Sequence, residues 1–194
     1  MTLSAILLAG GFSRRMGVDK ATVVVAGKPL WQRQLSVLKA TQPNVLWVSA
    51  RARLPWCPPQ IEVVVDLTPS RGPLSGVTAG LRRLQTSHLL VLAVDLPQMT
   101  ADHLRKLWGL ARHGCGVIPS HGNYLEPHCA IYPAGALAAA EESLNGSDAS
   151  LQSLARKLLQ LSKAQVHVLT SGERPLYLNM NTPDDLPADE GPAR

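Results

Sequence analysis

Two runs of consecutive apolar residues constrain the fold of this chain more than any other feature. They are SAILLA at 4–9 and HLLVLAVD at 88–95, and neither alternates apolar with polar side chains. A strand with one face in water alternates, so a continuous run of this length indicates a strand that is buried on both faces. Such strands are typical of parallel sheets with helices on both sides.

Amphipathic helices are predicted between these strands. Pro29 stands where the first helix would begin, and apolar residues recur after it at helical spacing. Three such stripes precede residue 115: Trp31, Leu35 and Leu38; Leu74, Val77, Leu81 and Leu84; and Leu104, Leu107, Trp108 and Ala111, with Thr100 as a candidate N-cap. Two further strands are predicted at 45–50 and 62–66. This alternation predicts an α/β fold with three αβα layers and a mainly parallel, mixed, Rossmann-like sheet.

The pattern changes beyond residue 115. The predicted elements are strands at 116–119 and 127–132, helices at 134–144 and from Ser150, strands at 165–169 and 177–181, and a helix start at TPDDL (182–186). No internal repeat or linker divides the chain. We therefore expect one domain over 1–186, followed by a mobile tail at 187–194.

Polar groups follow the predicted strands at the point where each one ends. Gly10 and Gly11 follow the first strand, Asp66 follows the third and Asp95 the fourth. Parallel sheets bind ligands at the carboxyl ends of their strands. The sequence therefore predicts a site at this edge of the sheet.

The net charge of +5 and its distribution limit the classes of ligand that this site can bind. The densest basic cluster is Arg14, Arg15 and Lys20, and aromatic residues are not interleaved with basic ones as a base-stacking surface requires. A small polyphosphate fits this distribution better than nucleic acid does. No apolar run reaches membrane length, and three cysteines form no C-x-x-C pair. We expect a soluble, cytoplasmic protein that binds neither membrane nor nucleic acid.

The basic cluster lies in the loop LAGGFSRRMGVDK at 8–20. Glycines let backbone N–H groups approach a phosphate, and Arg15 and Lys20 add positive charge. The loop matches neither G-x-G-x-x-G nor G-x-x-x-x-G-K-[ST]. From the residues alone it is either a phosphate loop or a solvated basic turn.

The same loop carries a family resemblance. The string L-A-G-G-x-S-x-R-M-G-x-D-K resembles the signature of the GT-A-like nucleotidyltransferases, and in particular of the molybdenum cofactor guanylyltransferase (MobA) family. Further matching pieces follow in order: GKPLWQ (27–32), GPLSG (72–76), VDLPQM (94–99), LEPHCAIY (125–132) and NMNTPDDL (179–186). The resemblance spans Leu8 to Leu186 and implies a nucleotidyltransferase fold.

The resemblance also implies roles for individual residues. The L-A-G-G loop would wrap a guanine nucleotide, Arg15 and Lys20 would contact its triphosphate, and Asp95 would bind Mg²⁺. The implied nucleotide-binding residues are Leu8, Ala9, Gly10, Gly11, Lys20, Ser49, Asp66 and Asp95, and the implied residues for the pterin substrate are Asn179 and Asn181. Ser49 departs from the asparagine that family members often carry there. L-A-G-G together with G-P-L-x-G favours GTP over CTP.

The implied reaction transfers GMP from GTP to the phosphate of the molybdopterin cofactor and releases pyrophosphate, with Mg²⁺ as cofactor and Arg15, Lys20 and Asp95 as catalytic residues. The acceptor phosphate is mostly dianionic at neutral pH, so the reaction needs no general base. Partners implied besides the two substrates are cofactor-delivery proteins and molybdoenzymes. The alternatives are a relative that uses CTP or another phosphorylated acceptor, a GTP- or cofactor-binding module without catalysis, and a nucleic-acid binder. His113, Cys115, His128 and Cys129 lack the spacing of a zinc site.

Overall fold

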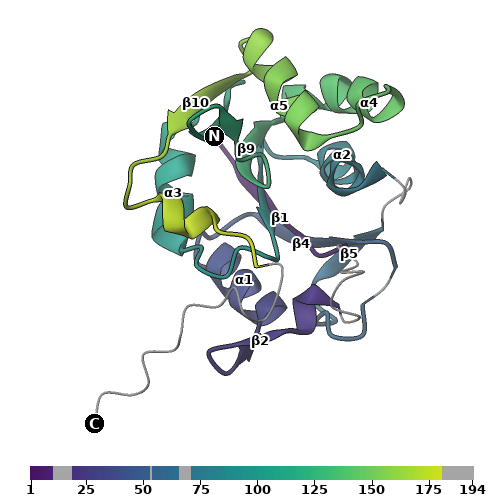
Figure 1. The fold of residues 1–194 in the computed structure, drawn as a ribbon. Helices are drawn as coiled ribbons and strands as arrows, with labels where there is room; N and C mark the ends of the chain where they lie inside the picture. The colour runs from purple at the N-terminus through teal and green to yellow at the C-terminus, as the bar shows by residue number, and fades with distance from the viewer. Residues whose placement is uncertain (11–18, 53, 66–70, 181–194) are drawn as a thin grey trace.

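A mixed eight-stranded sheet forms the centre of the molecule (Figure 1). The computed structural model describes residues 1–10, 19–52, 54–65 and 71–180. Among these residues the strand order is β10-β7-β9-β6-β1-β4-β5, and β8 pairs with the outer part of β7.

The parallel half of the sheet is built from the apolar runs. β1 (Leu3–Leu8) lies between β4 (Val45–Ala50) and β6 (His88–Ala93) and is parallel to both, and β5 (Glu62–Val65) extends the sheet beyond β4. Every residue of β1 and β6 is buried. The four strands predicted from the sequence are thus confirmed, with ends that shift by at most two residues.

The other half of the sheet contains an antiparallel insertion. β9 (Cys129–Pro133) runs antiparallel to β6 and to β7 (Gly116–His121), and β8 (Tyr124–Leu125) forms a hairpin with β7. β10 (Ala164–Val168) then pairs in parallel with β7. Because β9 is reversed, its first residue lies at the sheet edge where the parallel strands end.

Helices cover both faces of the sheet, which confirms the predicted three-layer α/β fold. α1 (Leu30–Lys39) and α3 (Ala101–Leu110) share one apolar core with the sheet, while α2 (Pro73–Arg83), α4 (Leu137–Asn145) and α5 (Leu151–Gln160) share the other. Figure 1 shows these two groups on opposite sides of β1. None of the described helices is both long and apolar enough to cross a membrane.

Capping residues set several helix ends. The Thr100 hydroxyl accepts a hydrogen bond from the His103 amide at 3.3 Å, as predicted, and Ser150 caps α5 in the same way. Pro29 is the N-cap of α1 and also closes the short hairpin of β2 (Val24–Val25) and β3 (Lys28–Pro29). Two 3₁₀ turns complete these connections: η1 (Lys20–Thr22) before the hairpin and η3 (Ala134–Ala136) before α4.

The strand predicted at 177–181 is wrong. Tyr177 ends a 3₁₀ turn, η4 (Arg174–Tyr177), and the described residues after it belong to no strand. Tyr177 and Met180 are buried, whereas Leu178 and Asn179 between them are exposed. This burial period of three cannot be met by a strand, whose side chains alternate with a period of two. The predicted helix start at 182–186 and the tail lie outside the described residues.

Candidate functional site

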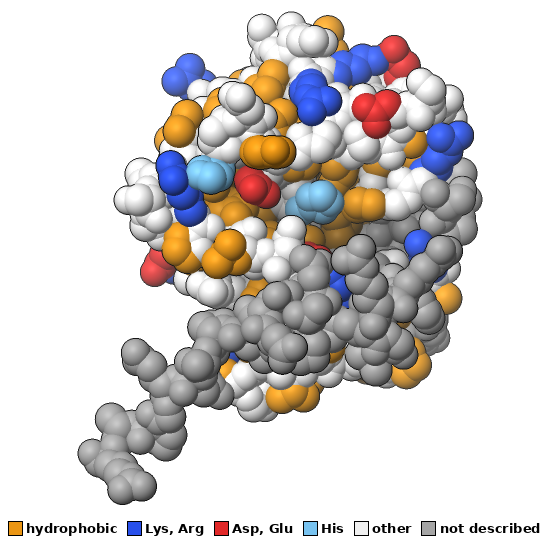
Figure 2. Space-filling view, viewed as in Figure 1, with side chains coloured by type: hydrophobic (Ala, Val, Ile, Leu, Met, Phe, Trp, Pro, Cys, Tyr) orange, Lys and Arg blue, Asp and Glu red, His pale blue; other side chains and the backbone are white. Residues whose placement is uncertain are grey.

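A cavity of about 290 Å³ opens at the edge of the sheet where the parallel strands end. This is the edge at which α/β sheets bind their ligands, and the volume is near the lower end for small-molecule sites, roughly 300 Å³. The described residues that line it are Leu8, Gly10, Lys20, Ser49, Arg51, Gly72, Pro73, Ala93, Val94, Asp95 and His128. Figure 2 shows a face of the molecule on which histidine side chains lie among hydrophobic ones, while acidic side chains are found both near the middle and, like most Lys and Arg side chains, toward the rim.

The cavity collects five of the residues predicted for the site. Leu8, Gly10, Lys20, Ser49 and Asp95 all line it, although they come from four separate stretches of the chain. Ala9 is buried beside them, and its amide donates to the Ser49 carbonyl at 2.9 Å. Four further predicted residues, Gly11, Arg15, Asp66 and Asn181, lie outside the described residues.

A pair of opposite charges occupies the cavity wall. Lys20 Nζ lies 3.3 Å from Asp95 Oδ2, and the two side chains are 15% and 26% exposed. Water is partly excluded here, so each charge acts more strongly on a bound ion than it would at the surface. The ammonium can therefore attract a phosphate while the carboxylate attracts a cation.

Asp19 holds Lys20 in place. One carboxylate oxygen of Asp19 accepts from the Ala21 amide at 3.0 Å and caps η1, and the other accepts from the Trp56 indole N–H at 3.0 Å. Trp56 in turn stacks on Trp31 of α1, with ring centroids 5.3 Å apart. The aspartate of the R-M-G-x-D-K motif thus acts on Lys20 by fixing the turn that presents it.

The loop that carries Asp95 is held from two sides. On one side, the Val94 amide donates to the Leu8 carbonyl at 3.1 Å and ties the loop to β1. On the other, Arg33 and Gln34 of α1 donate to the carbonyls of Pro97 and Leu96. Because these hydrogen bonds tie the main chain on both sides of Asp95 to β1 and α1, they fix the position of the Asp95 carboxylate.

Only glycine fits at both glycine positions of the GPLSG segment. Gly72 has φ 61° and ψ −152°, a conformation that is essentially restricted to glycine. At Gly76 an added Cβ would lie 2.2 Å from Ser49 Oγ, so α2 can approach β4 this closely only through glycine. The N-terminal end of α2 consequently lines the cavity, where its partial positive charge favours an anion.

Arg51 and His128 line the cavity but were not predicted for it. Arg51 follows the end of β4, so the strand-end argument could have found it. His128 lies in the matching piece LEPHCAIY, but the sequence assigns it no role at the site, because the reversed direction of β9 could not be read from the sequence. That reversal brings the His128 carbonyl to 2.8 Å from the Ala93 amide at the end of β6. Burial lowers the pKa of His128, and the negative charge of Asp95 offsets part of this effect.

The described residues nearest the C-terminus contact the loop that carries Asp95. The Met180 amide donates to the Asp95 carbonyl at 2.9 Å, and the neighbouring Asn179 side chain is exposed. One residue of the pair predicted for the second substrate thus lies next to the residue predicted to bind the metal. A contact of Asn179 with substrate stays a prediction.

Comparisons with known proteins agree with this arrangement. A family model described as the MobA-like NTP transferase domain matches residues 5–168. A protein named probable molybdenum cofactor guanylyltransferase from Opitutus terrae is 37% identical over 94% of this chain and 92% of its own length. A protein named molybdenum cofactor guanylyltransferase from Syntrophotalea carbinolica is 31% identical over 94% of this chain and 88% of its own.

Solved structures show the same fold. The crystal structure of molybdopterin-guanine dinucleotide biosynthesis protein A from Archaeoglobus fulgidus has a TM-score of 0.67 at 26% identity, covering 94% of each chain. A nucleotidyl transferase from Methanothermobacter thermautotrophicus has a TM-score of 0.74 at 17% identity, covering 95% of this chain and 94% of its own. At this identity the second likeness concerns the fold alone.

Proposed function

This chain belongs to the MobA-like NTP transferase family, and on that premise we propose that it transfers GMP from GTP to the phosphate of the molybdopterin cofactor, releasing pyrophosphate. The observation that carries the proposal is the Lys20–Asp95 pair at 3.3 Å in a cavity at the strand ends. The relatives named as guanylyltransferases support GTP as the donor and molybdopterin as the acceptor.

The cavity residues suit a reaction between anions. Lys20 would neutralise charge that develops on the leaving pyrophosphate, and the N-terminal end of α2, at Gly72 and Pro73, would bind phosphate oxygens. The acceptor is already a dianion at neutral pH, so the chain needs to hold the reacting groups in line and to exclude water. Arg51 adds a second positive charge to the same wall.

Asp95 is the residue that would hold Mg²⁺. Its carboxylate faces the cavity and is 26% exposed, so it is accessible to a hydrated cation. Mg²⁺ commonly takes one or two protein carboxylates and completes its shell with water and substrate phosphates. When bound, the metal would supply charge neutralisation at the phosphates. The family resemblance alone supports contacts with the nucleotide or the pterin for four further residues: Gly11, Arg15, Asp66 and Asn181.

Pyrophosphate release tests the proposal directly. The purified protein would be incubated with GTP, CTP or ATP, with and without molybdopterin, and with Mg²⁺ or with EDTA. We expect release only when GTP, molybdopterin and Mg²⁺ are present together. Faster release with CTP would identify a cytidylyl enzyme. GTP binding without release under any condition would identify a binding module, and either result would overturn the proposal.

A further inference from the structure

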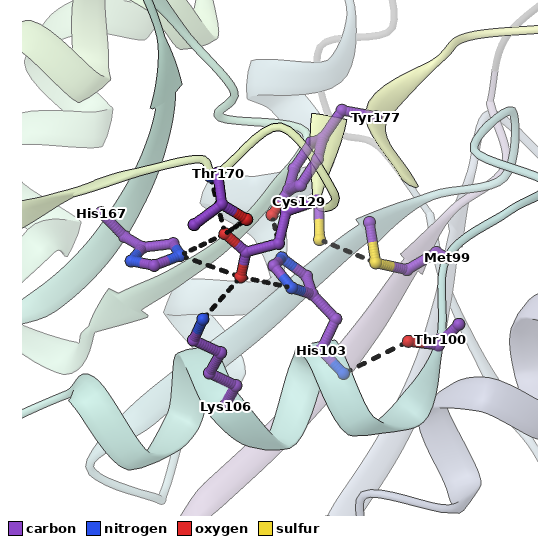
Figure 3. A network of polar contacts seen from close by, with 9 residues as sticks. Met99, Thr100, His103, Lys106, Cys129, His167, Thr170 and Tyr177 are labelled. Atoms are coloured by element: carbon purple, nitrogen blue, oxygen red, sulfur yellow. Dashed lines mark hydrogen bonds and ion pairs between the residues drawn. The ribbon is translucent and has the colours of Figure 1, made fainter. Parts of the chain in front are cut away.

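A network of polar side chains, of which His103 and Tyr177 are buried, lies beside the candidate site and takes no part in the proposed reaction (Figure 3). It joins α3, the end of β10 and η4, and its two central members are Glu173 and Tyr177. Glu173 is the N-cap residue of η4 and Tyr177 is its last residue. The network therefore holds the 3₁₀ turn at both ends.

Glu173 accepts hydrogen bonds from three neighbouring residues. Its carboxylate accepts from Lys106 Nζ at 2.7 Å, from the Thr170 amide at 2.9 Å and hydroxyl at 3.0 Å, and from His167 Nε2 at 3.3 Å. Burial raises the pKa of Glu173, but these hydrogen bonds outweigh burial and hold the pKa well below its ordinary value. The carboxylate is therefore charged throughout the neutral range.

His103 connects the two central residues. Its Nδ1 lies 3.4 Å from Glu173, and its Nε2 lies 2.7 Å from the Tyr177 hydroxyl. A carboxylate can only accept, so the proton of the neutral imidazole belongs on Nδ1, and Nε2 accepts from Tyr177. Burial lowers the pKa of His103, which keeps this neutral form. The tyrosine ring also packs edge-on against the imidazole, with centroids 5.4 Å apart.

The chain leaves this network directly toward the candidate site. Three residues after Tyr177, the Met180 amide donates to the Asp95 carbonyl at 2.9 Å. The segment 174–180 is thus fixed at one end by side chains and at the other by the main chain of Asp95. Asn179 projects into solvent between these two anchors. Its position relative to Asp95 depends on both.

We propose that Glu173 and Tyr177 are positioning residues for the second substrate, because they fix segment 174–180 and so hold Asn179 beside Asp95. The inference rests on the proposed function for the identity of that substrate. A packing role alone would be met by apolar side chains, which need no partners once buried. The polar network instead restricts the segment to one conformation, since each buried donor and acceptor must keep its partner.

Steady-state kinetics separate a positioning role from a structural one. Tyr177→Phe removes only the hydroxyl that bonds to His103. Lys106→Gln removes a half-exposed partner of Glu173 and is the second test variant, to be used if Tyr177→Phe folds poorly. We expect the KM for molybdopterin to rise about tenfold, the effect of one lost buried hydrogen bond. The KM for GTP should stay within about twofold. Equal changes in both KM values, or a change in melting temperature alone, would overturn the inference.

Amide hydrogen exchange tests the same inference without turnover. In both variants the amides of 174 and 176–180, Met180 above all, should exchange about tenfold faster than in the unaltered protein. Glu141→Gln is the control, since it breaks an exposed ion pair between α4 and Arg82 and should change neither exchange nor KM. Unchanged exchange in both variants would refute the positioning role. Absence of turnover in the unaltered protein would instead refute the proposed function, and exchange would still decide whether the network holds the segment.

Discussion

Replacing Lys20 with alanine should abolish most turnover and leave the fold intact. The ammonium lies 3.3 Å from Asp95 inside the cavity, at a place where a bound triphosphate would meet it. A unit charge about 4 Å from a phosphate oxygen contributes about 4 kcal/mol at the effective dielectric near a protein surface. Partial exposure of the side chain reduces this to about 3 kcal/mol in the transition state, which converts to a loss of roughly a hundredfold in kcat.

The same substitution should change stability little. Lys20 and Asp95 both reach solvent, and ion pairs of this kind contribute about 1 kcal/mol or less. For a chain of this size that is a shift of roughly 2–4 °C in Tm. Pyrophosphate release and thermal melting, measured on the same preparation, give the two quantities.

Lys157→Ala is the matched control for Lys20→Ala. Lys157 is also a partly exposed lysine in an ion pair, with Glu142, but it lies on α5 away from the cavity. Its replacement should cost a similar amount of stability with kcat unchanged. Turnover of Lys20→Ala within fivefold of the unaltered protein would refute the assigned role, and so would an equal loss in the control.

Three further predictions concern the frame of the site and the fold. Gly76→Ala would place a Cβ 2.2 Å from Ser49 Oγ, so we expect about 1–2 kcal/mol less stability in urea unfolding and a higher KM for GTP. Trp56→Phe removes the indole donor to Asp19, which should raise the KM for GTP about fivefold, as one lost hydrogen bond of about 1 kcal/mol allows. Burial lowers the pKa of His103 in the folded protein. Below about pH 6.5 the unfolded chain therefore takes up a proton that the folded chain does not. The free energy of unfolding should consequently fall between about pH 7 and pH 5.

Each of these has its own control. Gly109 lies on α3 with nothing within 4 Å of an added Cβ, so Gly109→Ala should stabilise by about 0.5–1 kcal/mol. Trp108→Phe changes a tryptophan outside the site and should leave the KM for GTP unaltered. The pH dependence should weaken in His103→Gln, and an unweakened slope would show that other groups cause it.

The parallel half of the fold was predictable because its signals are local. Continuous apolar runs mark β1 and β6, helical spacing marks α1 to α3, and Thr100 caps α3 as its sequence context indicates. The edge of the sheet that carries the cavity follows from strand direction alone. Lys20 and Asp95 could each be named from the family resemblance without knowledge of their contact.

The sequence by itself determined the order of strands and helices in the parallel half of the fold, the sheet edge of the site and the residues that a family motif marks. The tertiary structure alone decided what depends on long-range pairing. It reversed β9 and so brought His128 to the cavity, and it joined Asp19 to Trp56 across 37 positions. It also placed Tyr177 at the end of a 3₁₀ turn instead of in the expected strand, and it anchored Tyr177 on His103 and Met180 on Asp95. Local periodicity records which side of an element is buried, whereas these features depend on partners that lie far away in the chain.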